Sequence, residues 1–155
     1  MAYVPPTRGQ LQEIPTGARE LAAYKTKTFS NTAGNGALND VIPLFRVTGT
    51  CLVALRGYCE TTLAGATATL VHGKAGATND LITILTCTAI TAGTGIDSTA
   101  AVVARGTALA KTPLKTYFDG DTINATNATA AITGGKINYI CTFLPLTEGA
   151  GVEAL

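Results

Sequence analysis

The feature that most constrains the fold is a series of short apolar and β-branched segments, separated by clusters of glycine and asparagine, that begins near Lys25 and ends near Leu146. Segments of this length, rich in Val, Ile, Thr and Tyr and bounded by turn residues, are typical of β-strands. Glycine and β-branched residues interrupt every stretch that is long enough for a helix of more than about two turns. Closely spaced strands without crossover helices favour antiparallel pairing. The sequence therefore predicts an all-β fold, an antiparallel β-sandwich or jelly roll of about eight or nine short strands.

The alternation of residue types places the expected strands and their faces. We expect strands at residues 25–30, 41–47, 50–60, 66–72, 81–85 with a continuation to 90, 101–105, 114–118, 122–132 and 136–144. Turns are expected at 73–80, at Asp119-Gly120-Asp121 and at Gly134-Gly135. Within 50–60, one parity carries small and apolar residues, and the other carries Arg56 and Tyr58. This strand is thus expected to have one side on a core and one side in solvent.

The two ends of the chain differ from this middle part. Prolines and glycines interrupt residues 1–24, which we expect to form an extended arm with isolated apolar anchors rather than a disordered terminus. The candidate partner-binding residues of this arm are Tyr3, Val4, Pro5, Pro6, Leu11, Ile14, Leu21 and Tyr24. Residues 25–147 are expected to form the sandwich, and residues 148–155 a tail that is flexible or docked on a neighbour.

The composition indicates a surface that meets other protein. Charged residues make up only 14% of the chain, whereas hydrophobic residues make up 46%. A soluble monomer usually keeps a charge-rich surface, so a surface of threonine, alanine and glycine favours burial against other subunits. The net charge of +1, without a basic stripe, argues against a nucleic-acid partner. No apolar run is long enough to cross a membrane and no secretory signal is visible, so synthesis in the cytoplasm is expected.

Residues that could carry chemistry are few, and none forms a recognisable site. The four cysteines lack a CxxC spacing and are expected to be buried free thiols, and we expect no metal and no cofactor. The only histidine, His72, is expected to be structural or solvent-facing, because no nucleophile signature lies near it. Asp119 and Asp121 form the only tight acidic pair. We expect Asp-Gly-Asp to form a turn rather than a catalytic pair, because Asp side chains hydrogen-bond the nearby backbone in turns. We therefore expect a protein that is not an enzyme.

Several segments together resemble a known group of proteins. These segments are Ile42-Pro-Leu-Phe-Arg-Val-Thr-Gly49, Leu52-Val53, Gly57-Tyr-Cys59, Thr61-Thr-Leu63, Gly65-Ala-Thr-Ala-Thr-Leu70, Ile132-Thr-Gly-Gly-Lys-Ile137 and Phe143-Leu-Pro-Leu146. Over roughly residues 40–147 the chain resembles small virion structural proteins of tailed bacteriophages, of the capsid decoration or cement type.

The resemblance implies a protein that binds the outside of a phage head and stabilises contacts between capsomers. It implies the major capsid protein and neighbouring copies as partners, with a trimer favoured, and a location on the capsid exterior. The alternatives are another virion component, such as a tail, fibre or head–tail joining protein, and a carbohydrate-binding module. The last is disfavoured because the chain has no tryptophan and only 6% aromatic residues.

Overall fold

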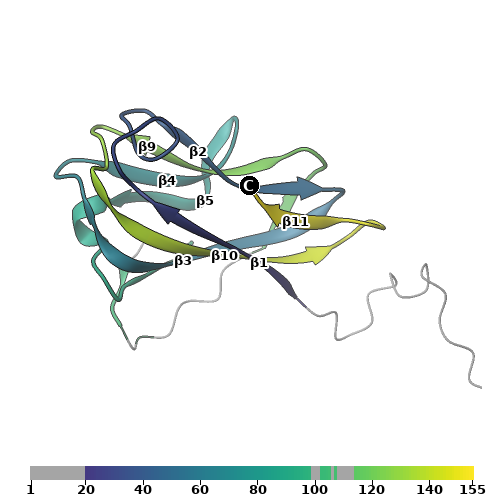
Figure 1. Cartoon of the computed structure of the whole chain (residues 1–155). Coiled ribbons are helices and arrows are strands. Elements are labelled where there is room, and N and C mark those ends of the chain that lie inside the picture. The colour runs from purple at the N-terminus through teal and green to yellow at the C-terminus, as the bar shows by residue number, and fades with distance from the viewer. Residues whose placement is uncertain (1–19, 99–101, 106, 108–113) are drawn as a thin grey trace, which may run out of the picture.

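Two antiparallel sheets packed face to face make up the protein, as the computed structural model shows (Figure 1). The structure describes residues 20–98, 102–105, 107 and 114–155. Sheet A contains, in spatial order, β1 (Leu21–Thr28), β10 (Gly134–Pro145), β3 (Cys51–Ala64), β6 (Gly95–Ile96) and β7 (Val102–Val103), and β8 (Lys115–Tyr117) also pairs with β3. Sheet B contains β11 (Gly151–Ala154), β2 (Val41–Thr48), β9 (Thr122–Ala128), β4 (Thr69–Lys74) and β5 (Ala77–Thr86). The expectation of an all-β, antiparallel sandwich is confirmed.

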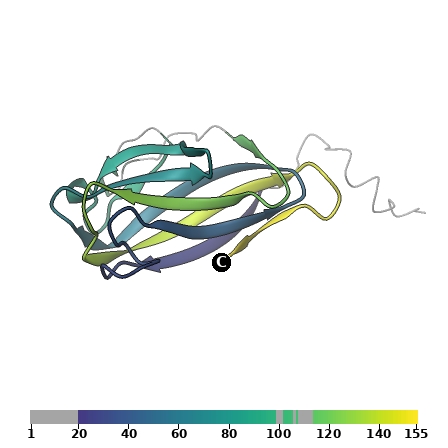
Figure 2. The same cartoon turned by 90° about the horizontal axis from the view of Figure 1, so that it is seen from above.

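The main strand pairs are nested within one another along the chain. β1 pairs with β10, β2 with β9, β3 with β8, and β4 with β5. The chain therefore runs like one long hairpin whose successive pairs lie alternately in sheet A and sheet B. As a result, the outermost strands β1 and β11 lie along the same margin of the sandwich (Figure 2).

Alternating side chains of the two sheets build the core between them. On β10, Ile137, Tyr139 and Cys141 are buried, and the residues between them are only half-buried. β9 repeats this pattern with Ile123 and Ala125. Because successive residues of a strand point to opposite faces, each strand contributes one apolar row to the core.

The four cysteines are all buried and unpaired, as the sequence predicts. They are Cys51, Cys59, Cys87 and Cys141. Burial raises the pKa of the Cys87 thiol to about 11 and that of Cys141 to about 12. These thiols are therefore neutral and behave as small apolar side chains.

Several expected boundaries are wrong. β1 begins at Leu21, so residues 21–24 belong to the sandwich and not to an arm, because they pair continuously with β10. In the expected tail, β11 pairs with β2. The expected turn at 73–80 is a tight hairpin, since β4 extends to Lys74 and β5 starts at Ala77. After Thr86 the chain enters the 3-10 turn η2 (Cys87–Ala89) and does not continue as a strand.

The two glycine turns have different outcomes. Asp119-Gly120-Asp121 is a turn, in which the Phe118 N–H donates to Asp121 Oδ2 at 2.9 Å and the Gly49 N–H donates to Asp119 Oδ1 at 2.9 Å. Gly134-Gly135 is instead the start of β10, at a register shift against β3. Gly135 has a φ of +112°, a conformation that residues with a Cβ rarely adopt.

Candidate partner-binding surface

The outer face of sheet A carries two exposed tyrosines. Tyr24 on β1 is 68% exposed and Tyr58 on β3 is 49% exposed. Tyr24 lies opposite Ile140 of β10, and Ile140 lies opposite Arg56 of β3. The neighbouring row of the sheet places Tyr58 opposite Asn138. The outward residues of these rows form a surface that we call the tyrosine face: Tyr24, Thr26, Arg56, Tyr58, Glu60, Lys136, Asn138 and Ile140.

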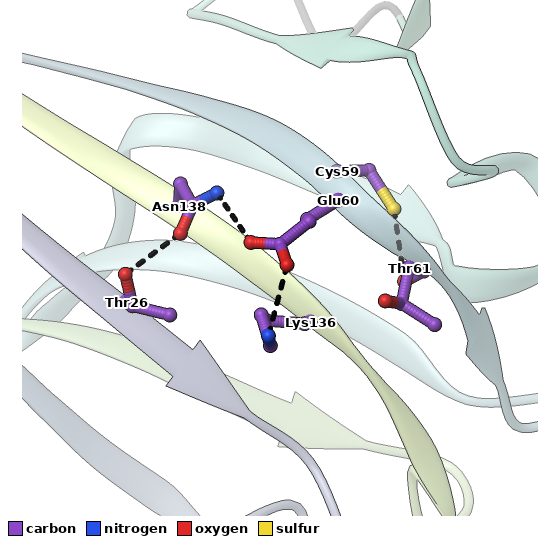
Figure 3. A network of polar contacts seen from close by, with 6 residues as sticks. All are labelled: Thr26, Cys59, Glu60, Thr61, Lys136 and Asn138. Atoms are coloured by element: carbon purple, nitrogen blue, oxygen red, sulfur yellow. Dashed lines mark hydrogen bonds and ion pairs between the residues drawn. The ribbon is translucent and has the colours of Figure 1, made fainter.

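A network of polar contacts links three strands of the tyrosine face (Figure 3). Glu60 accepts hydrogen bonds from Lys136 Nζ and from Asn138 Nδ2, each at 2.9 Å. Thr26 Oγ1 donates to Asn138 Oδ1 at 2.7 Å. The hydrogen bonds from Lys136 and then from Asn138 lower the pKa of Glu60, so its carboxylate stays ionised. An exposed ion pair adds little stability, and the effect of the network is to hold these side chains in fixed positions.

A small hollow adjoins the tyrosine face at the β6–β7 margin. Its volume is about 200 Å³. The residues that line it are Gly57, Tyr58, Gly93, Gly95, Val103, Ala104, Arg105 and Thr107. Tyrosine and arginine are enriched in protein–protein interfaces and are frequent hot spots there. The tyrosine face and this hollow together have the composition of a partner-binding surface.

The outer face of sheet B is different, because the side chains in its central rows are uncharged. Val41 lies opposite Thr126, which lies opposite Val71. Val41 is 54% exposed, and Ile84 on β5 is 63% exposed. Charged groups lie at one end of this face, where exposed Arg46 of β2 lies opposite Thr122 of β9 and Glu153 of β11. Uncharged threonine, valine and isoleucine side chains thus form the central part of this sheet surface.

The residues expected to contact a partner fall into two groups. Leu21 and Tyr24 lie on β1, where they are 47% and 68% exposed. The others, Tyr3, Val4, Pro5, Pro6, Leu11 and Ile14, lie outside the described residues. Sequence reasoning did not single out Glu60, Lys136 or Asn138, although the alternation of polar and apolar residues along 136–144 was a usable signal for two of them.

The other sequence candidates occupy structural positions. His72 is completely buried, and its Nε2 lies 2.9 Å from the Tyr139 hydroxyl. Burial lowers the pKa of His72 to about 3. Asp121 accepts a hydrogen bond from the Phe118 N–H of its own turn, and Asp119 accepts one from the Gly49 N–H of a neighbouring turn. Within the part of the chain that the structure describes, no three His, Cys, Asp or Glu side chains are grouped to hold a metal ion.

Comparison of the chain with protein-family models, with curated proteins and with solved structures gave no match. Among the described residues, no helix has the length and apolar character of a membrane span.

Proposed function

We propose that this chain is a capsid decoration (cement) protein, which binds the outside of a phage head, stabilises contacts between capsomers and catalyses no reaction. The observation that carries the proposal is the tyrosine face. Tyr24 and Tyr58 are solvent-exposed in adjacent rows of a regular sheet, and Arg56 lies beside them. Rigid aromatic side chains lose little conformational entropy when they are buried by a partner. Such a surface suits a permanent contact with the major capsid protein.

The outer face of sheet B, whose central rows are uncharged, supports a second contact, between neighbouring copies. Val41 and Ile84 are more than half exposed there. Exposed apolar side chains on a charge-poor surface favour association with other protein. Closed symmetric oligomers are the usual outcome for identical chains, and we favour a trimer.

The nested strand order also supports the proposal, although less directly. Four nested pairs that lie alternately in two sheets correspond to the winding of a jelly roll. This architecture occurs in viral capsid and lectin domains. A fold alone does not assign a function, so the proposal depends on the surface more than on the winding.

The mechanism is the simultaneous burial of several contacts. Residues 1–19, if extended, reach roughly 60 Å at about 3.3 Å per residue, which is far enough to contact a neighbouring capsomer. A specific interface buries on the order of 1,000 Å² or more. When an arm and a sheet face bind together, each raises the effective concentration of the other, so dissociation requires both to break. The protein is then made in the host cytoplasm and retained on the capsid exterior.

The test is the binding of the purified full-length protein to phage heads that lack it, measured by co-sedimentation and by mass-spectrometric stoichiometry. Decoration predicts copies in the hundreds per head, whereas a head–tail joining protein gives about a dozen and a fibre protein fewer still. The variant Tyr24→Ala/Tyr58→Ala is expected to weaken binding about tenfold or more. The control Thr88→Ala lies in η2, outside both sheet faces, and should bind as the unaltered protein does. Absence of binding to heads, or binding at a single vertex, would exclude decoration.

A further inference from the structure

β1 is the outermost strand of sheet A and presents an unusually regular edge. Its eight residues pair with β10 in one continuous register, without a bulge. The other sheet margins are less regular: β5 has register shifts against β4, and β11 and β7 contain four and two residues. Bulged or very short edge strands are poor templates for a further strand, whereas a long regular edge is a good one.

The hydrogen-bond pattern identifies which backbone groups point away from the sheet. The Phe29 N–H donates to the Gly135 carbonyl at 2.9 Å, directly after the pair Thr28–Lys136. Hydrogen-bonded and non-hydrogen-bonded pairs alternate in an antiparallel ladder. The backbone N–H and C=O groups of Lys27, Lys25 and Ala23 therefore point toward β10. The N–H and C=O groups of Ala22, Tyr24, Thr26 and Thr28 therefore point outward. Within the described part of the chain, no backbone bond from these four residues leads to any strand beyond β10.

The side chains beside this edge are positively charged. Lys25 and Lys27 share the parity of Ala23, which packs against the core, so both lie at the margin between the two sheets. The Lys25 Nζ donates to the Leu155 carbonyl. Burial and then the charge of Lys25 lower the pKa of Lys27, and Asp40 partly offsets this. An inward lysine on an edge strand disfavours pairing with an unselected strand and favours one that brings negative charge.

We propose that the free edge of β1 binds an extended strand of a partner protein that carries acidic side chains opposite Lys25 and Lys27. The added strand continues sheet A: it accepts hydrogen bonds from the outward N–H groups of Ala22, Tyr24, Thr26 and Thr28 and donates its own N–H groups to their outward C=O groups. It also packs a side chain against Tyr24. A second copy of β1 is a poor occupant, since it brings its own lysines to the same side of the joined sheet. This inference rests on the proposed function, because it names how the capsid partner is held.

The experiment uses the full-length, ¹⁵N-labelled protein and two synthetic strand peptides. The acidic peptide alternates glutamate with valine, and the basic peptide has lysine in place of each glutamate. The acidic peptide is expected to slow hydrogen exchange of the Tyr24 and Thr26 amides about tenfold, and the basic peptide to leave it unchanged. In Lys25→Glu/Lys27→Glu the preference between the two peptides should reverse. An edge that binds any extended peptide, whatever its charge, would show no such reversal.

A matched pair of variants tests the role of the backbone. Ala22→Pro/Thr28→Pro removes two outward N–H groups without touching the bonds to β10, and Ala22→Val/Thr28→Val retains them. The proline variant is expected to lose the protection, and the valine variant to keep it, with both showing unchanged spectra for sheet B. Protection elsewhere, no protection by either peptide, or a β1-mediated dimer in sedimentation would overturn the inference.

The inference and the proposed function fail in different ways. If the proline variant binds phage heads as well as the valine variant does, the edge is not the capsid contact, but decoration stands. If the unaltered protein binds no heads while the acidic peptide still protects β1, decoration is wrong and the strand-accepting edge stands.

Discussion

The side chains of His72 and Tyr139 meet across the interior of the sandwich. His72 comes from β4 in sheet B and Tyr139 from β10 in sheet A, with their ring centroids 5.3 Å apart. His72 Nε2 has the tyrosine hydroxyl as its partner, whereas the buried Nδ1 has no hydrogen-bond partner among the described residues. A charged imidazole is very unfavourable in this position because the side chain is completely buried.

This burial makes the stability of the protein depend on pH. The pKa of His72 is about 3 in the folded chain and near 6.5 when exposed. Between these values the unfolded chain binds a proton that the folded chain does not, so the free energy of unfolding falls as the pH is lowered. The expected loss approaches roughly 1.4 kcal/mol per pH unit in the middle of this window.

Urea denaturation at a series of pH values measures this slope. The control is His72→Leu/Tyr139→Phe, which removes the titrating group and its partner together, so that neither is left unsatisfied. The slope between about pH 4 and pH 6 should be smaller in the control than in the unaltered protein. Equal slopes would show that other groups cause the acid sensitivity.

Gly57 provides a prediction about packing. A Cβ at this position would lie 2.6 Å from Ile96 Cγ1 and 3.2 Å from Ile137 Cγ2, inside the core. Gly57→Ala is therefore expected to destabilise the protein by about 1–3 kcal/mol, measured by chemical denaturation. Gly134→Ala is the control, because the nearest atom to its Cβ is 3.8 Å away, and its effect should be within about 0.5 kcal/mol.

At the scale of the elements, the last strand, β11, forms one edge of sheet B. β11 pairs with β2, and the Leu155 N–H donates to the Leu44 carbonyl at 3.0 Å. Val152 packs against the core, whereas its neighbour Glu153 lies opposite Arg46 and is exposed. The segment that the sequence indicates as a tail is thus an integral strand.

Substitution of the two neighbouring residues on β11 tests this assignment. Val152→Asp places a carboxylate against the core and is expected to lower the free energy of unfolding by about 2–3 kcal/mol. Glu153→Asp introduces the same side chain on the outward face and should change stability by less than about 0.5 kcal/mol. Equal, small effects of the two variants in thermal unfolding would mean that the strand is dispensable.

At the scale of the whole molecule, the arm and the sandwich are expected to contribute separately. Deletion of residues 1–24 would remove half of β1 together with the arm, so the effect of losing the arm could not be separated from damage to the sandwich. Deletion of residues 1–19 keeps β1 complete. We expect this shorter deletion to leave the thermal unfolding transition unchanged and to weaken binding to phage heads about tenfold or more, measured by co-sedimentation. Unchanged occupancy on the heads would exclude a binding role for the arm.

The nested topology has a consequence for folding that also belongs to this scale. β1 and β10, which are separated by more than a hundred residues, make eight residue pairs with each other. Contacts between residues so distant in sequence require the closure of long loops before they become favourable. The hairpin β4–β5, at the centre of the nesting, is the most local of the four main pairs.

Residue types and their alternation were sufficient to predict much of this protein. They predict the strand class, the burial of the four thiols and the Asp119-Gly120-Asp121 turn, because each depends on neighbours close in sequence. That Arg56 and Tyr58 share the outward side of their strand could also be predicted, since side chains alternate along a strand.

Only the tertiary structure decided which distant strands pair, and hence where the surfaces lie. Residues 21–24 and 151–154 have weak strand patterns and become strands because β10 and β2 supply partners for their backbone groups. The tyrosine face joins Tyr24, Tyr58 and Asn138, which are far apart in the chain and adjacent only through the register of three strands. The local pattern determines which side of a strand faces the core, whereas the packing of the whole core determines which distant strand becomes its neighbour.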